Sequence, residues 1–319
     1  KLSGVSALYF YNMQIKVLGS AAGGGYPQWN CNHPNSRKAR QNLAEAPPRT
    51  QSSIAISGDG ERWVLLNASP DLRQQINDSP ALHPKQKLRD SPIKAIVLTN
   101  ADVDHVGGLL NLRESQPLNL YGTERVLSVL KANSIFNVLN PDFVSRSQLE
   151  LDKNYTLREK DGTDLGIQIK PFAVPGKVAL WMEDNSEDGN FGSVQEDTIA
   201  LEIFSKNTSF FYIPACANMP TELANRIRKA ELVFFDGTLW VDDEMIRENV
   251  GVKTGARMGH MSLDGPEGTI NAFADLNVKR KIFIHINTTN PILIENTKER
   301  RTVEKHGWEV SYDGMEITI

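Results

Sequence analysis

The sequence contains few cysteines, since Cys31 and Cys216 are the only two in 319 residues. This number excludes a disulfide framework and favours a reducing, cytoplasmic compartment. An excess of positive charge is also absent, because 35 Lys and Arg are set against 39 Asp and Glu, a net charge of −4. We therefore expect no nucleic-acid partner, which would require a basic face. No apolar run approaches the roughly 18 residues of a membrane-spanning helix, so we expect no membrane span.

The composition is that of an ordinary globular protein, with 40% hydrophobic and 23% charged residues. A chain of this length can bury a large core without covalent cross-links. The segment Lys1–Asn12 precedes Met13, where the first strand pattern opens, and is interpreted as an extension or tag. We expect a single domain over residues 13–319.

Short runs of β-branched and aromatic residues recur along the chain and predict strands. The runs are Ile15–Leu18, Ser53–Ile56, Trp63–Leu66, Ile93–Leu98, Leu118–Tyr121, Ile167–Phe172, Ile199–Phe204, Phe210–Ile213, Leu232–Phe235, Lys281–Ile286 and Trp308–Tyr312. Apolar residues at helical spacing lie between several of them, over residues 72–76, 106–113, 123–133 and 221–230, and after Gly268. Thr221 is the predicted N-cap of its helix. Strands that alternate with helices predict a mixed α/β fold.

Four polar residues follow the strand Ile93–Leu98, namely Asn100, Asp102, Asp104 and His105. The end of a strand is where α/β folds place their ligands. The Gly-Gly pair that comes next allows the backbone to turn closely around a bound group. The alternative is that Asp102 caps a helix and that His105 packs in the core.

The spacing of these four residues resembles the His-x-His-x-Asp-His motif of the metallo-β-lactamase superfamily, with the first two histidines replaced. Asp236 and His285 each end a strand, where this superfamily carries a metal-bridging carboxylate and its last metal ligand. The loop Gly259–Ser262 resembles a further histidine loop. Lys177 stands where a mid-chain loop of the superfamily usually carries a histidine.

Longer strings narrow the resemblance to the pyrroloquinoline quinone (PQQ) biosynthesis protein B family. They are Leu18–Gly25, Pro27–Cys31, Arg49–Ser53, Asn67–Asp71, Phe235–Thr238 and His285–Pro291. The resemblance runs from about Met13 to the C-terminus. It implies the αββα sandwich of the metallo-β-lactamase-like fold. It also implies a place in the pathway that converts a Glu–Tyr cross-link into PQQ.

The chemistry of the remaining ligands points away from a two-zinc hydrolase. The candidate metal ligands are two imidazoles and three carboxylates, those of Asp102, Asp104, His105, Asp236 and His285. Two imidazoles and a carboxylate with open positions are typical of non-haem Fe(II) oxygenases. We therefore expect Fe(II), with O₂ in a vacant position. The sequence does not rank the three carboxylates, two of which could orient the histidines instead.

Further residues are candidates for contact with the substrate. His260 is interpreted as a catalytic proton donor or acceptor, because histidine titrates near working pH. The alternative for His260 is a hydrogen bond to backbone in a tight loop. Arg73, Lys177 and Arg257 are candidates for binding substrate carboxylates.

Cys31 lies in a polar loop where the resembled family commonly shows Cys-x-Cys-x-x-Cys, a structural zinc site. This chain has Cys31, His33 and Ser36 at these positions. Cysteine and histidine at this spacing could hold zinc, whereas serine is a poor ligand. A structural zinc ion and a metal-free loop are both left open.

The resemblance implies an iron-dependent hydroxylase that acts on an aromatic, tyrosine-derived intermediate during PQQ formation, and the ligand set agrees with iron. The resembled family has also been described as a carrier that moves PQQ or its precursor to the periplasm. A metal-dependent hydrolase is the third alternative. The sequence does not determine the oligomeric state.

Overall fold

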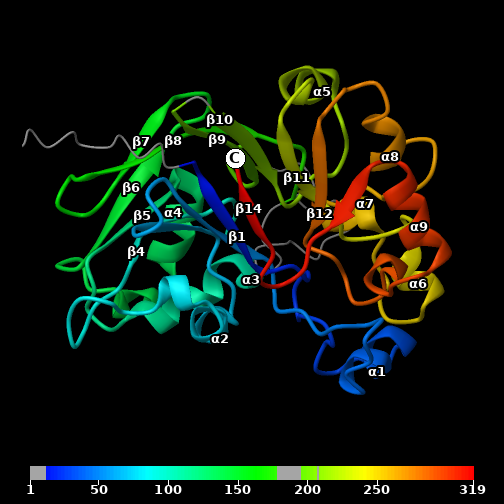
Figure 1. Ribbon diagram of the computed structural model, residues 1–319, viewed down its shortest axis with the longest axis horizontal. Coiled ribbons are helices and arrows are strands. Elements are labelled where there is room, and N and C mark those ends of the chain that lie inside the picture. Colours follow the sequence, from blue (N-terminus) through cyan, green and yellow to red (C-terminus); the bar gives the residue numbers. More distant parts are fainter. Residues whose placement is uncertain (1–11, 178–194, 207) are drawn as a thin grey trace, which may run out of the picture.

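The computed structural model describes residues 12–177, 195–206 and 208–319. Within these residues the strands form two seven-stranded sheets (Figure 1). The predicted extension lies almost entirely outside the described residues. No helix in the described ranges has the length and apolar character that crossing a membrane requires.

The first sheet has the strand order β14-β1-β2-β3-β4-β5-β6. Its strands are β1 (Gln14–Gly19), β2 (Ser53–Ser57), β3 (Trp63–Leu66), β4 (Ile93–Val97), β5 (Leu118–Thr123), β6 (Val144–Leu149) and β14 (Glu316–Thr318). The pairs from β14 to β3 are antiparallel, and those from β3 to β6 are parallel. The parallel half of this sheet therefore delivers the end of β4 to one edge.

The second sheet has the order β13-β12-β11-β10-β9-β8-β7. Its strands are β7 (Tyr155–Arg158), β8 (Asp164–Ala173), β9 (Ile199–Ser205), β10 (Thr208–Ile213), β11 (Leu232–Asp236), β12 (Arg280–Ile284) and β13 (Trp308–Val310). The pairs from β10 to β13 are parallel, and the others are antiparallel. The ends of β11 and β12 consequently lie side by side.

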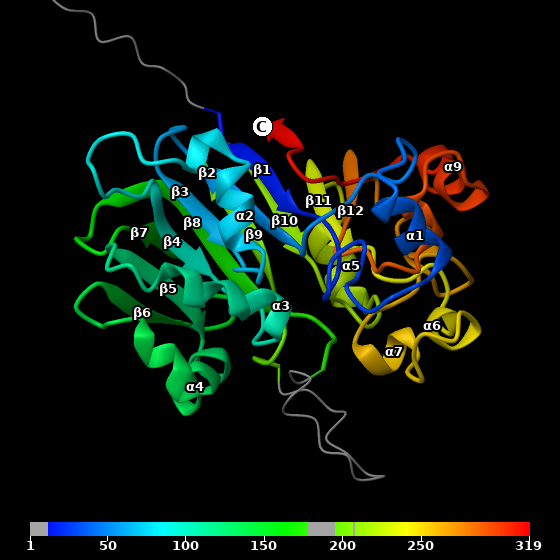
Figure 2. The same ribbon diagram turned by 90° about the horizontal axis from the view of Figure 1, so that it is seen from below.

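Helices flank the two sheets. They are α1 (Pro34–Arg40), α2 (Leu72–Asn77), α3 (Val103–Val106), α4 (Glu124–Ala132), α5 (Thr221–Ile227), α6 (Glu244–Arg247), α7 (Gly255–Met258), α8 (Thr269–Ala272) and α9 (Lys298–Lys305). Short 3₁₀ helices are η1 (Pro80–Leu82), η2 (Gly107–Leu112), η3 (Ser134–Val138) and η5 (Pro291–Leu293). Figure 2 shows α2 and α4 beside the first sheet, with α1, α6, α7 and α9 beyond the second.

Three buried apolar clusters correspond to the layers. One contains residues of both sheets, such as Ile56 from β2 and Phe234 from β11, and fills the space between them. A second joins the first sheet to α2 and α4. The third joins the second sheet to α5, α8 and α9. This arrangement is the predicted αββα sandwich, because each sheet buries one face against the other sheet and one against helices.

Most predicted strands agree with the structure, and the differences have local causes. The strand Trp63–Leu66 is predicted to the residue. The strand β6 escapes prediction because its sequence, VSRSQL, is largely polar and lies at a sheet edge. The predicted N-cap at Thr221 is wrong, since α5 already includes Thr221 and Pro220 takes the cap position.

Candidate metal centre

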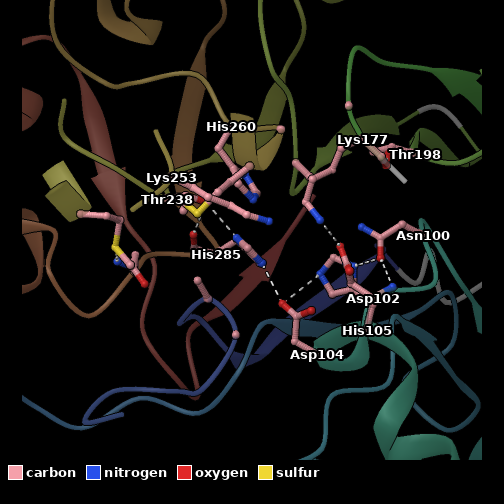
Figure 3. Close-up of a pocket in the computed structure, with 18 of the residues that line it drawn as sticks. Asn100, Asp102, Asp104, His105, Lys177, Thr198, Thr238, Lys253, His260 and His285 are labelled. Atoms are coloured by element: carbon pink, nitrogen blue, oxygen red, sulfur yellow. Dashed lines mark hydrogen bonds and ion pairs between the residues drawn. The ribbon is translucent and has the colours of Figure 1, made fainter. Parts of the chain in front are cut away.

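Three strand ends converge on a cavity of about 270 Å³ at one edge of the sandwich (Figure 3). The short helix α3 after β4 contributes Asp104 and His105, the loop after β11 contributes Thr238, and His285 directly follows β12. Because the cavity lies between the ends of both sheets, its walls come from distant parts of the chain.

The loop after β4 is held by Asn67, which has a φ of 64°. The Asn67 side chain accepts from the Thr99 backbone N–H at 2.9 Å and donates to the Thr99 hydroxyl at 2.9 Å. Further along, Gly108 packs so closely that an added Cβ would lie 2.1 Å from the carbonyl oxygen of Ser69. This contact explains the glycine after the polar cluster, since only a residue without a side chain fits there.

Asp104, His105 and His285 form the first group of possible metal ligands, with one atom of each within 4.8 Å of the others. Oδ2 of Asp104 lies 3.0 Å from Nε2 of His285 and 3.9 Å from Nε2 of His105. Two ligands that bind one ion at about 2.1 Å and at right angles are about 3.0 Å apart. The trio therefore has the spacing of ligands to a single ion.

His105 presents an unprotonated nitrogen to this group. The Asp102 backbone N–H donates to Oδ1 of Asn100 at 3.0 Å, which identifies that atom as an acceptor. Nδ1 of His105 lies 2.6 Å from the same oxygen and must therefore carry the proton. Nε2 of His105 is buried and has no hydrogen-bond partner. A buried nitrogen with a free lone pair beside a carboxylate is the arrangement expected of a metal ligand.

The electrostatic environment supports the same protonation states. Burial lowers the pKa of His105 and outweighs the attraction of Asp104, which keeps this imidazole neutral. Burial alone would raise the pKa of Asp104, but the hydrogen bond with His285 holds it below its usual range. His285 has a φ of 61°, a left-handed backbone conformation that is uncommon for a non-glycine residue.

Asp236, His260 and His285 form a second group within 4.8 Å, on the Nδ1 side of His285. Asp236 is fully buried, and its Oδ2 accepts from the Cys216 backbone N–H at 2.9 Å. Oδ2 also lies 2.6 Å from Nδ1 of His260, and Oδ1 accepts from the Thr238 hydroxyl at 2.6 Å. Both oxygens are thus engaged with protein groups, and Asp236 lies behind the histidines instead of lining the cavity.

Charged residues line the other walls of the cavity. Nζ of Lys177 lies 3.6 Å from Oδ2 of Asp102, and both residues line the cavity. Arg73 and Arg257, the other predicted substrate ligands, are not among the lining residues. Lys253 and Asn287 do line it and were missed, because Lys253 belongs to no motif. Asn287 lies within the string His285–Pro291. This string supports the family resemblance, but it does not indicate that Asn287 lines the cavity.

The loop with Cys31 and His33 forms a different cavity, next to Glu248. Nδ1 of His33 accepts from the Asn35 backbone N–H at 3.2 Å, at the start of α1. Nε2 lies 3.0 Å from Oε2 of Glu248, so both ring nitrogens are engaged. Within the described residues, no group of three ligand atoms includes Cys31 or His33. The described His, Cys, Asp and Glu side chains therefore do not by themselves supply the set of ligands that a structural zinc ion requires at this loop.

The comparisons with known proteins agree with this fold. The Beta-lactamase superfamily domain matches residues 62–286. A coenzyme PQQ synthesis protein B from Xanthomonas oryzae pv. oryzae is 55% identical and covers 96% of this chain and 100% of its own. One from Gluconacetobacter diazotrophicus is 53% identical and covers 96% and 99%. This chain belongs to the coenzyme PQQ synthesis protein B family.

Solved structures extend the comparison for this family member. Zn²⁺-bound PqqB from Methylobacterium extorquens is 46% identical, with a TM-score of 0.91, and covers 96% of this chain and 100% of its own. A diphosphatase of the PhnP family has a TM-score of 0.68 at 19% identity and covers 97% of each chain. The second likeness shows the fold alone, which is the metallo-β-lactamase fold.

Proposed function

We propose that this protein acts in PQQ synthesis as an Fe(II)-dependent hydroxylase of an aromatic, tyrosine-derived intermediate. The role in PQQ synthesis is supported by full-length similarity to proteins of that name. Metal binding at the cavity is supported chiefly by one observation, Nε2 of His105, which has no hydrogen-bond partner and lies beside Asp104 and His285.

The three residues fit a metal ion. A trio of two imidazoles and one carboxylate, open to a cavity, matches the ligand set of non-haem iron oxygenases. Iron bound there would supply the redox chemistry toward O₂ that zinc cannot supply. The same ligand set would also suit zinc, and a relative of this family has been solved with Zn²⁺ bound.

The chain's own residues have separable tasks in this proposal. Asn100 holds the proton of His105 at Nδ1, which keeps Nε2 available as a ligand. Asp236 orients His260 through its Nδ1, so that the opposite nitrogen can exchange a proton with a substrate in the cavity. Lys177 supplies a positive charge for a substrate carboxylate beside Asp102.

Anaerobic reconstitution tests the proposal. The metal-free protein is loaded with Fe(II) or Zn(II), mixed with the tyrosine-derived intermediate and a two-electron reductant such as ascorbate, and exposed to isotopically labelled O₂, so that one oxygen atom enters the product and the other is reduced to water. We expect label in the product with Fe(II) only, and none for the His105→Ala or His285→Ala variants. Turnover with zinc in the absence of O₂ would support the hydrolase, and binding without any product would support the carrier.

A further inference from the structure

A buried carboxylate beside the cavity has no part in the metal chemistry proposed above. Glu244, the first residue of α6, is only 5% exposed. Its Oε2 accepts from the Trp240 backbone N–H at 2.6 Å, and its Oε1 accepts from the Thr289 hydroxyl at 2.5 Å. Burial of a carboxylate is costly even when it is hydrogen-bonded, so its position here calls for an explanation.

The hydrogen bond to Glu244 fixes the direction of the Thr289 hydroxyl, and this hydroxyl in turn orients the side chain of Asn287. Because Thr289 donates its one proton to ionised Glu244, its oxygen can only accept from other groups. Nδ2 of Asn287 lies 2.7 Å from that oxygen and donates to it. Nδ2 also lies 3.1 Å from Sδ of Met245, a weak acceptor. These contacts fix the orientation of the Asn287 carboxamide, with Nδ2 directed toward Thr289 and Met245.

The other end of the carboxamide is an acceptor at the cavity wall. Asn287 lines the same cavity as His285 and Lys253, and the bonds that its side chain makes to described residues all involve Nδ2. Oδ1 is therefore left to accept a hydrogen bond from a ligand.

We propose that Asn287 contacts the substrate and accepts a hydrogen bond from one of its N–H or O–H groups, and that Glu244 and Thr289 position it. The inference rests on the proposed function for the substrate class, in which an amino-acid-derived aromatic carries an ammonium and a phenol hydroxyl. Asn287 would thus discriminate between molecules that possess this donor and otherwise identical molecules that lack it.

Binding measurements with three probes test the inference. The probes are L-tyrosine, 3-(4-hydroxyphenyl)propanoate, which lacks the ammonium, and O-methyl-L-tyrosine, which lacks the phenol donor. Affinities for the Zn(II)-loaded protein are measured by calorimetry under nitrogen at about pH 8, where Glu244 is ionised. The variants are Asn287→Ala and Thr289→Val, with Thr289→Ser as the control that keeps the hydroxyl. Thermal melting confirms that each variant is folded.

We expect Asn287→Ala and Thr289→Val to weaken L-tyrosine binding about tenfold, the size of a lost hydrogen bond to a charged or strongly polar donor. One of the two altered probes should bind the wild-type protein as weakly as the variants bind L-tyrosine. Neither substitution should weaken the binding of that probe further, and the group that it lacks is then the hydrogen-bond donor to Asn287. Thr289→Ser should bind like wild type. Equal weakening for all three probes, no effect of the variants, or no binding of L-tyrosine at millimolar concentration would overturn the inference. Normal probe discrimination without oxygen incorporation would instead contradict only the proposed function.

Discussion

Oδ2 of Asp104 lies 3.0 Å from Nε2 of His285, although 181 residues separate them in the chain. Asp104 belongs to α3, which follows strand β4 of the first sheet, and His285 follows strand β12 of the second sheet. An ion held by both residues would therefore join the two halves of the sandwich. Metal binding should therefore be measurable as an increase in the stability of the folded protein as well as through activity.

Metal binding should raise the melting temperature of the wild-type protein. An ion present at about 100 times its Kd stabilises the native state by about 2.7 kcal/mol. His105→Ala should abolish the shift, because it removes the partnerless Nε2. His260→Ala should retain it, since His260 belongs to the other ligand group, with Asp236. Differential scanning fluorimetry against metal concentration checks both. A shift in melting temperature that is lost in His260→Ala and kept in His105→Ala would instead place the ion at the group of Asp236, His260 and His285.

Asn100 should control metal affinity without binding the ion. Asn100→Ala removes the acceptor that holds the proton of His105 at Nδ1. We expect the metal Kd to rise by about 10–100-fold, as for other residues that orient a ligand histidine. Asn100→Asp keeps an acceptor oxygen and should stay within a few-fold of wild type. Chelator competition measures both constants, and equal losses in the two variants would contradict this role.

Gly108 should tolerate no side chain. Gly108→Ala places a Cβ 2.1 Å from the Ser69 carbonyl oxygen, so the backbone beside His105 must move. We expect a loss of about 1–3 kcal/mol or more in the free energy of unfolding. Gly122→Ala is the matched control, because its nearest contacts are at an ordinary 3.4 Å. Urea denaturation of both variants compares them, and equal stability would refute the packing argument.

Glu244 should make stability decrease as the pH rises. Burial raises the pKa of Glu244 from 4.5 to about 7, against the opposing hydrogen bonds from Thr289 and Trp240. Between these two values the native state holds a proton that the unfolded state has released, so unfolding becomes easier with increasing pH. The loss through this window is on the order of 3 kcal/mol.

Glu244→Gln removes this titration. The difference in unfolding free energy between wild type and Glu244→Gln, measured in urea from pH 4 to pH 8, should therefore change by that amount. A difference that does not vary with pH would show that the native pKa of Glu244 is ordinary.

Local sequence determined the strands and the places where they end. The apolar pattern of a buried strand can be read directly from consecutive residues of the sequence. For this reason Trp63–Leu66 could be predicted to the residue, and Asp236 and His285 were expected at strand ends. The family strings supplied the sandwich and the role in PQQ synthesis. Edge strands such as β6 were missed because an edge needs fewer apolar residues.

Only the tertiary structure decided what each polar residue contacts. Asp104 and Asp236 are equivalent candidates in the sequence, yet one faces the cavity and the other is bonded behind it. Hydrogen-bond direction depends on distances between residues far apart in the chain, such as Glu244 and Thr289, which leave no local pattern. For the same physical reason, the unprotonated nitrogen of His105 could be recognised only after Asn100 was placed beside it.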